Sequence, residues 1–155
     1  MAACLTTFST TAQAQNADYL SFGIGWWDLN DDQDAVDMRV EYRPAIPVLV
    51  ENLNPWIGAE VTSDGSVWGG GGLLYDWEVS PQWHVIPNFG AGLYGQGGSD
   101  KDLGHVIEFR SQLEIAYEFE TQQRLGVSIG HLSNASLDDE NPGTEVLNLY
   151  YHIPW

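Results

Sequence analysis

The feature that most constrains this chain is a two-residue alternation of apolar and polar side chains. It begins at Tyr19 and returns after every turn or loop as far as the last residue, Trp155. Successive side chains of a β-strand point to opposite faces, so this period indicates strands with one apolar and one polar face. No comparable stretch follows the 3.6-residue period of a helix, and the predicted fold class is therefore all-β.

Turn-forming residues divide the alternation into eight segments. We expect strands at 19–26, 36–43, 56–62, 73–77, 83–94, 107–118, 125–133 and 147–155. The proline-containing segment 45–55 is interpreted as a connection, and the run 69–72 of four glycines as a place where the sheet bends or packs closely. Several strands approach the length of about ten residues that crosses a bilayer when tilted, and an even number can close without a free edge.

The charged side chains of these strands share a face. Glu108, Arg110 and Glu114 lie on one face of segment 107–118, and Arg39 and Glu41 on one face of segment 36–43; the opposite faces are apolar. A soluble barrel would turn the apolar face inward, whereas a membrane barrel turns it outward. The pattern alone leaves both open. In a membrane barrel these charged side chains would lie in the lumen, where we expect them to form ion pairs.

Two further features favour the membrane barrel. The charged face also carries glycines, which suit the narrow, side-chain-filled lumen of an eight-stranded barrel (Gly23, Gly25, Gly90 and Gly92). The chain also ends on an alternating strand with a terminal aromatic residue, Trp155, which resembles the assembly signal of outer-membrane barrels. We therefore predict an eight-stranded antiparallel up-and-down transmembrane β-barrel, with a soluble lipocalin-like carrier as the alternative.

The length, charge and N-terminal sequence limit the number of domains and the partners of the chain. Its 155 residues suffice for one domain, and a net charge of −17 with only five Lys and Arg argues against nucleic acid as a partner. Residues 1–14 resemble a truncated signal peptide that ends in the small-x-small sequence Ala12-Gln13-Ala14, so we expect the barrel domain to span 15–155. Lipoprotein processing at Cys4, the one cysteine, is the alternative.

Polar residues on the apolar face are concentrated at one place. His131 and Ser133 have the parity of Leu125, Val127 and Ile129, and Glu145 has the parity of the apolar residues of the last strand. His131 and Glu145 are equally distant from residue 138, so a symmetric hairpin places them directly opposite each other. We expect all three on the outer wall near one rim.

Serine, histidine and carboxylate in this order are the components of a catalytic triad. Ser133 would be the nucleophile, His131 its base, and Glu145 the group that orients the imidazole. Asn134 would bind a developing oxyanion together with nearby backbone N–H groups. His-x-Ser is a weak motif by itself, and polar residues are also tolerated at a rim because water is close.

The C-terminal sequence "HLSNASLDDENPGTEVLNLYYHIPW" resembles the lipid A 3-O-deacylase (PagL) family. It has the pattern His-x-Ser-Asn, followed by a glutamate fourteen residues after the histidine, at His131, Ser133, Asn134 and Glu145. The resemblance implies an eight-stranded outer-membrane barrel that hydrolyses the ester-linked 3-hydroxyacyl chain at the 3 position of lipid A. It assigns the same four residues to the site, and the mechanism requires no metal or other cofactor.

The expected partner is lipopolysaccharide in the outer leaflet of the bacterial outer membrane, and a homodimer is left open. The remaining alternatives are a non-catalytic small barrel of adhesin or structural type and another lipid A enzyme, such as a barrel acyltransferase. Because lipid A is phosphorylated and the chain is acidic, we expect divalent cations at the membrane surface to bridge the two, with Lys101 assisting headgroup binding. The histidines outside the triad (His84, His105 and His152) form no metal-ligand pattern, and we expect interior hydrogen bonds for those with lumen parity.

Overall fold

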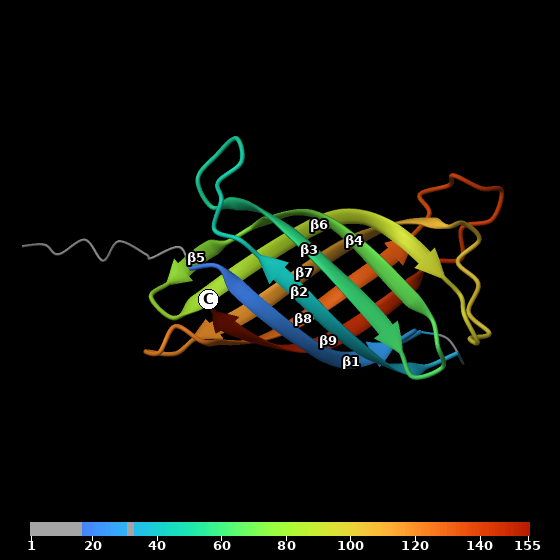
Figure 1. Cartoon of the computed structure of the whole chain (residues 1–155), viewed down its shortest axis with the longest axis horizontal. Coiled ribbons are helices and arrows are strands. Elements are labelled where there is room, and N and C mark those ends of the chain that lie inside the picture. Colours follow the sequence, from blue (N-terminus) through green and yellow to red (C-terminus); the bar gives the residue numbers. More distant parts are fainter. Residues whose placement is uncertain (1–16, 31–32) are drawn as a thin grey trace, which may run out of the picture.

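The computed structural model describes residues 17–30 and 33–155, so the expected signal peptide lies outside the described residues. Within this described part of the chain, nine strands follow one another (Figure 1). They are β1 (Tyr19–Trp27), β2 (Ala35–Arg43), β3 (Leu53–Thr62), β4 (Val67–Tyr75), β5 (Trp77–Ser80), β6 (Trp83–Gly95), β7 (Ile107–Glu118), β8 (Arg124–Ser133) and β9 (Thr144–Pro154).

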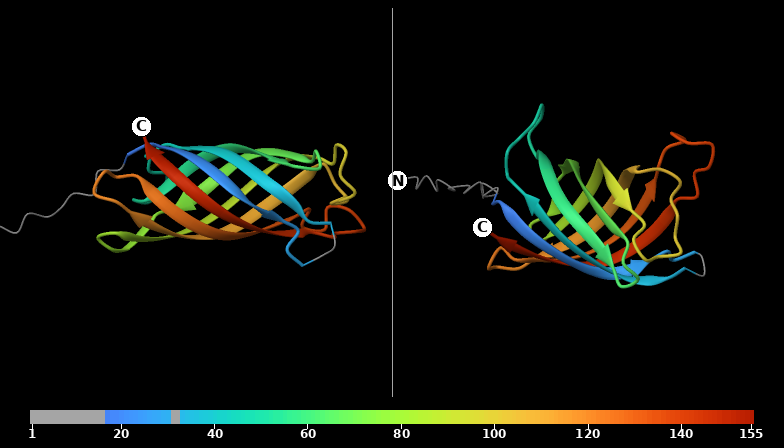
Figure 2. Two further views of the ribbon diagram at one scale, coloured as in Figure 1. Left: turned by 90° about the horizontal axis from the view of Figure 1, so that it is seen from below. Right: turned by 45° about the vertical axis from the view of Figure 1, so that its right-hand side comes forward.

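These strands form one closed antiparallel barrel (Figures 1 and 2). Apart from β4 and β5, strands that follow one another pair in the sheet, and β1 pairs with β9 to close it. Both β4 and β5 pair with β6, so they are two parts of a single barrel strand that is interrupted at Asp76. The predicted eight-stranded up-and-down barrel is thus confirmed, and its fourth strand is broken.

Two boundaries differ from the prediction. Pro55 lies inside β3 and not in a connection, and Gly69–Gly72 lie inside β4, paired on both sides. Pro55 is tolerated because it pairs only with β4 there; the pairing with β2 starts at Ile57, so no partner needs the missing N–H. The glycines escaped the alternation pattern because they carry no side chain that could be apolar or polar.

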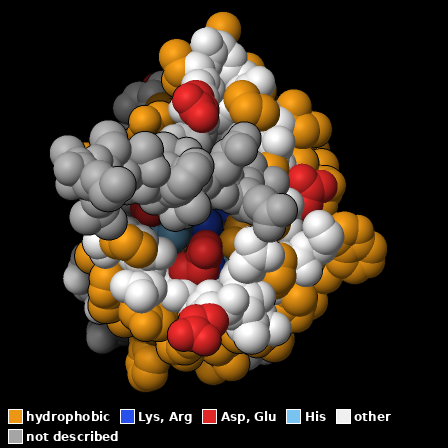
Figure 3. Space-filling view, turned by 90° about the vertical axis from the view of Figure 1, so that its left-hand side faces the viewer, with side chains coloured by type: hydrophobic (Ala, Val, Ile, Leu, Met, Phe, Trp, Pro, Cys, Tyr) orange, Lys and Arg blue, Asp and Glu red, His pale blue; other side chains and the backbone are white. Residues whose placement is uncertain are grey.

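The apolar face of the sheet points outward. On β7, Leu113 and Ile115 are 48% and 51% exposed, whereas Arg110 and Glu114, on the opposite face of the strand, are almost completely buried. Seen from the end that carries the termini, hydrophobic side chains surround the circumference and charged ones lie at the centre (Figure 3). The soluble alternative, in which the apolar face lines the interior, is therefore wrong.

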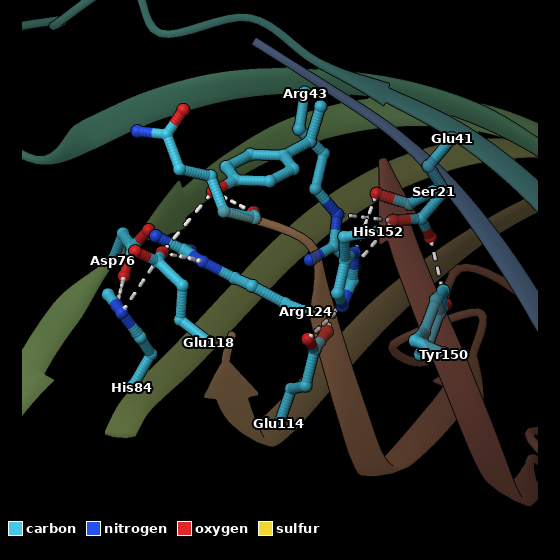
Figure 4. Close-up of polar contacts among 12 residues, drawn as sticks. Ser21, Glu41, Arg43, Asp76, His84, Glu114, Glu118, Arg124, Tyr150 and His152 are labelled. Carbon is cyan, nitrogen blue, oxygen red and sulfur yellow. Dashed lines mark hydrogen bonds and ion pairs between the residues drawn. The ribbon is translucent and has the colours of Figure 1, made fainter. Parts of the chain in front are cut away.

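The lumen is filled by an ion-pair network. Arg110 Nη2 lies 2.6 Å from Glu41 Oε1, and Arg43 Nη2 lies 2.8 Å from Glu41 and 2.9 Å from Glu114. Figure 4 shows how part of this network spans the lumen from β2 to β7. The predicted pairing is confirmed for these residues and for Arg39, which contacts Asp37 and Glu60. Glu108 differs: its carboxylate is buried and forms no ion pair with a described residue.

The lumen histidines complete the network. His84 Nδ1 lies 2.6 Å from Asp76, and the His152 ring contacts Ser21 at 2.8 Å and Glu114 at 2.7 Å (Figure 4). Interior hydrogen bonding is confirmed for both. Within residues 17–30 and 33–155 no group of His, Cys, Asp and Glu side chains is arranged to hold a metal ion. A helix long and apolar enough to cross a membrane is likewise absent from this part of the chain.

Two tryptophans use the space that glycines leave inside the barrel. The rings of Trp56 and Trp68 stack with centroids 6.0 Å apart, and the Arg110 guanidinium lies 4.0 Å from the centre of the Trp56 ring. A Cβ added to Gly70 would come within 2.6 Å of the Trp68 ring, so only glycine fits there. The interpretation of 69–72 as a place of close packing is confirmed for its inward-facing members.

Adjacent glycines of β4 provide a test of this inside-outside assignment. We expect Gly70→Ala to lower the free energy of unfolding by about 1–3 kcal/mol, because the new methyl group overpacks the lumen. We expect Gly69→Ala to be neutral or slightly stabilising, because its Cβ would meet no atom within 4 Å. Urea unfolding in lipid vesicles measures both. Equal destabilisation by the two variants would contradict the assignment.

Candidate active site

The polar residues predicted for the outer wall lie at the end of the barrel opposite the termini. His131 follows Leu125, Val127 and Ile129 along the outward face of β8, and the β8–β9 connection, residues 134–143, projects from this end (Figures 1 and 2). Glu145 is the second residue of β9 and is paired directly with His131. The predicted opposition of the two residues across the hairpin agrees with this register.

A hydrogen bond joins this pair. His131 Nδ1 and Glu145 Oε1 are 3.2 Å apart, and the side chains are 46% and 36% exposed on the outer wall. A carboxylate at Nδ1 favours the tautomer with its proton on that nitrogen, which leaves Nε2 free to accept a proton. The pair therefore has the geometry of a general base with its orienting carboxylate.

Ser133 is the last residue of β8 and lies on the same face as His131. Two residues of strand rise separate their Cα atoms by about 6.7 Å, a distance that a histidine side chain can bridge. The Ser133 hydroxyl is half-buried and forms no hydrogen bond with a described residue. The structure thus brings His131 and Glu145 into contact, with Ser133 next to them and its hydroxyl unengaged.

Gly143 supports the imidazole from the loop side. Its φ of +61° lies in the left-handed region, and a Cβ added there would come within 2.8 Å of His131 Cε1. Glycine is therefore required at this position twice, by the backbone conformation and by the approach of the ring. Sequence reasoning missed this residue, although a glycine just before the β9 alternation was a visible turn signal.

Asn134 lies on the inner side of the wall and is completely buried. Its Nδ2 donates to the carbonyl oxygens of Leu103 at 3.0 Å and Glu140 at 2.8 Å, and its Oδ1 accepts from the Ser136 N–H at 2.9 Å. In this conformation the side chain connects the β6–β7 and β8–β9 loops and has no amide hydrogen free for an oxyanion. The proposed oxyanion role of Asn134 stays a prediction.

A buried polar cluster anchors the start of β9 next to Glu145. Lys101 Nζ lies 2.8 Å from Asp28 Oδ1, which also accepts a hydrogen bond from the Thr144 hydroxyl at 2.9 Å. Lys101 is only 5% exposed, so the expectation that it contacts lipid headgroups is wrong. Its partner Asp28 lies 73 residues away in the chain, and no local pattern indicated this pairing.

A shallow groove on the outer wall extends from the His131–Glu145 pair toward the middle of the barrel. Its lining includes Pro87, Leu113 and Ile129, with Ser111 directly opposite His131 in the β7–β8 register. Ser111 is a small residue between Phe109 and Leu113 on the outward face. It was not singled out from the sequence, although it interrupts the apolar alternation of its strand.

Comparisons with known proteins identify relatives of this chain. The model of the lipid A 3-O-deacylase (PagL) family matches residues 48–154, which is more than half of the chain. Lipid A deacylase PagL of Bordetella bronchiseptica is 24% identical over 108 residues, covering 64% of this chain and 61% of the relative. Lipid A deacylase PagL of Pseudomonas aeruginosa is 34% identical over 64 residues, covering 41% and 37%. The matches thus span less than two thirds of either relative.

Solved structures share the fold. A crystal structure titled as the outer membrane enzyme PagL superposes with a TM-score of 0.69 at 19% identity, covering 88% of this chain and 99% of the other. Neisserial surface protein A gives a TM-score of 0.65 at 11% identity, with 89% and 97% covered. At these identities the superpositions establish the small barrel fold, which proteins with different names share.

The contact between Gly143 and the imidazole can be tested directly. We expect Gly143→Ala to change the imidazole ¹⁵N chemical shifts of His131, because the added methyl group displaces the ring. Gly65→Ala is the matched control: its φ of +100° imposes a similar backbone strain, of about 1–2 kcal/mol, but it lies in the β3–β4 turn and does not touch His131. Unchanged His131 resonances in Gly143→Ala would contradict the assigned contact.

Proposed function

The chain belongs to the lipid A 3-O-deacylase (PagL) family, and on this premise we propose that it hydrolyses the ester of the 3-O-linked 3-hydroxyacyl chain of lipid A. The observation that carries the proposal is the hydrogen-bonded His131–Glu145 pair on the outer wall, with Ser133 beside it. The reaction class is carboxylic ester hydrolysis, and its product is a free 3-hydroxy fatty acid.

The site faces lipid in the outer leaflet of the bacterial outer membrane. The apolar outer wall is the membrane-spanning surface, and the β8–β9 connection lies at the end opposite the termini. In the proposed orientation the termini are on the periplasmic side and this connection is extracellular. Polar residues on a lipid-facing wall cost little near the interface and a few kcal/mol at the bilayer centre. Their position at one rim is therefore tolerable, and it is the depth at which acyl esters of outer-leaflet lipid A are found.

The chemistry follows the roles of the three side chains. Ser133 Oγ attacks the ester carbonyl carbon while its proton passes to His131 Nε2, and Glu145 stabilises the imidazolium through Nδ1. The carbon–oxygen bond to the sugar then breaks, and the sugar oxygen takes the proton from His131. Water activated by the same imidazole cleaves the acyl-serine, which releases the fatty acid and restores the Ser133 hydroxyl.

The groove below the pair supports the choice of a lipid substrate. Its floor and walls are mainly apolar, and it begins at the histidine and extends along the direction in which a lipid acyl chain lies. An acyl chain in this groove would place its ester near the rim, where Ser133 lies. Binding energy from the chain would thus help to hold the carbonyl in an attack geometry.

The oxyanion role of Asn134 requires a change in its hydrogen bonds. We keep Asn134 as the proposed partner, which requires that its amide release the Leu103 or Glu140 carbonyl when substrate binds. The adjacent backbone N–H of Ala135 has no hydrogen bond with a described residue and is the nearby backbone donor for the same charge.

Removal of the nucleophile tests the proposal. We expect Ser133→Ala and His131→Ala each to lower lipid A deacylation by about 10³-fold or more, and Glu145→Gln to lower it somewhat less, because triad members act as a unit. The measurement is mass spectrometry of lipid A from outer membranes that contain each variant. Ser128→Ala, on the same strand but facing the lumen, is the matched control and should retain full activity.

Two outcomes would contradict the proposal. Undiminished deacylation by Ser133→Ala, with the barrel folded as judged by its heat-dependent mobility in gel electrophoresis, would remove the serine from the mechanism. Lipid A that gains an acyl chain in the presence of the unchanged protein would instead indicate an acyltransferase.

A further inference from the structure

The β2–β3 loop, residues 44–52, projects sideways from the barrel at the end that carries the termini (Figures 1 and 2). The projection is directed away from the barrel axis and not beyond the end of the barrel. Its tip is apolar: Ile46, Leu49 and Val50 are 58%, 91% and 56% exposed. Three large aliphatic side chains in one short exposed loop are costly in water, at a rate of about 25 cal/mol per Å² of apolar surface.

The loop is held at its base and within its turn. Both carboxylate oxygens of Asp18 accept hydrogen bonds, from the Ala45 N–H at 2.8 Å and from the Tyr42 hydroxyl. These hydrogen bonds, the one from Tyr42 first, lower the pKa of Asp18 from its ordinary value, so the anchor is ionised at neutral pH. The Val48 N–H donates to the Leu53 carbonyl at 2.7 Å. The apolar tip is thus presented in a defined conformation.

Leu49 is an unexpected residue for its backbone conformation. Its φ is +68°, in the left-handed region where glycine, asparagine or aspartate are the less strained choices. With 91% of its surface exposed, the side chain gains almost no packing within the chain in return. In water, a leucine at this position is disfavoured both by its strained backbone and by the exposure of its apolar side chain. The cost of exposure disappears when the side chain lies in apolar surroundings.

The loop continues a surface that already contacts lipid in the proposed orientation. At the same end, outward aromatic residues form the kind of girdle that marks a membrane interface, on every barrel strand except β1, β3 and β8 (Tyr42, Tyr75, Trp77, Trp83, Tyr117, Tyr151 and Trp155). On β3 the corresponding outward positions are Leu53, Pro55 and Ile57. The loop leaves the wall beside this sector, at the depth of the girdle.

We propose that the tip of the β2–β3 loop, residues 46–50, inserts into the acyl-chain region of the leaflet at this rim and anchors the barrel there. In the orientation given above this is the inner, phospholipid leaflet. Leu49 therefore contacts lipid, and not a second copy of the chain or a periplasmic protein. The inference requires that the barrel spans a membrane, but it does not depend on the Ser133 chemistry.

A fluorescent label at position 49 tests the proposal. In a Cys4→Ser background, Leu49→Cys is labelled with a polarity-sensitive fluorophore and the full chain is reconstituted into phosphatidylcholine vesicles. We expect a blue-shifted emission, strong quenching by lipids with a nitroxide on the acyl chain, and loss of most quenching by iodide supplied on both sides of the bilayer. Glu120→Cys, in the exposed β7–β8 turn at the same end, is the matched control and should show the opposite pattern.

Each other occupant gives a distinct result. A label at position 49 that iodide quenches as strongly as the label at position 120 would overturn the proposal and leave the tip free for a protein partner. Emission that depends on the lipid-to-protein ratio would overturn it in favour of a second copy. The same measurement in the Ser133→Ala variant should be unchanged, so a failure of the anchor and a failure of the catalytic proposal are distinguishable.

Discussion

Most of the charged side chains enclosed in the narrow lumen pair with one another, and these ion pairs depend on the register of the strands that carry them. Arg110 on β7 reaches Glu41 on β2, and Arg43 on β2 reaches Glu114 on β7, so two ion-pair links cross the interior. An unpaired buried charge costs several kcal/mol. A slip of one residue would also turn every side chain of a strand to the other wall. The pairing that fills the interior therefore also determines that His131 points outward.

The sequence predicted those features that depend on strand parity and local symmetry. The alternation gave the outward face of each barrel strand, and the equal spacing of His131 and Glu145 about residue 138 gave their cross-strand pairing, which the register contains. The alternation of strand faces also applies to Asn134. Asn134 has the opposite parity to His131 and Ser133, so its inward position, where it connects two loops, could have been expected from the same rule.

Other features could not be predicted because their causes lie far apart in the chain or carry no side-chain signal. The break at Asp76 coincides with contacts to His84 on the adjacent strand β6 and to Arg124 on β8, which does not pair with β4 or β5, and a local pattern does not reveal these contacts. The glycines of β4 show no alternation of apolar and polar side chains. Glycine is needed at the inward positions because the two lumen tryptophans occupy the space there. In the sequence Lys101 resembles an exposed cation, but the carboxylate with which it forms a buried ion pair is 73 residues away.

The three members of the proposed triad differ in how firmly the sheet holds them. His131 is paired with Ser111 on one side and Glu145 on the other, so the imidazole and its carboxylate are fixed by the ladders of three strands. Ser133 is paired only with β7, because the β8–β9 ladder ends one residue earlier. The next residue, Asn134, is the anchor of the loop. The proposed base is thus preorganised by the barrel, whereas the position of the proposed nucleophile depends on a loop that substrate headgroups would contact first. A substrate that moves this loop would act on the distance from Ser133 to His131, and hence on the step that begins the reaction.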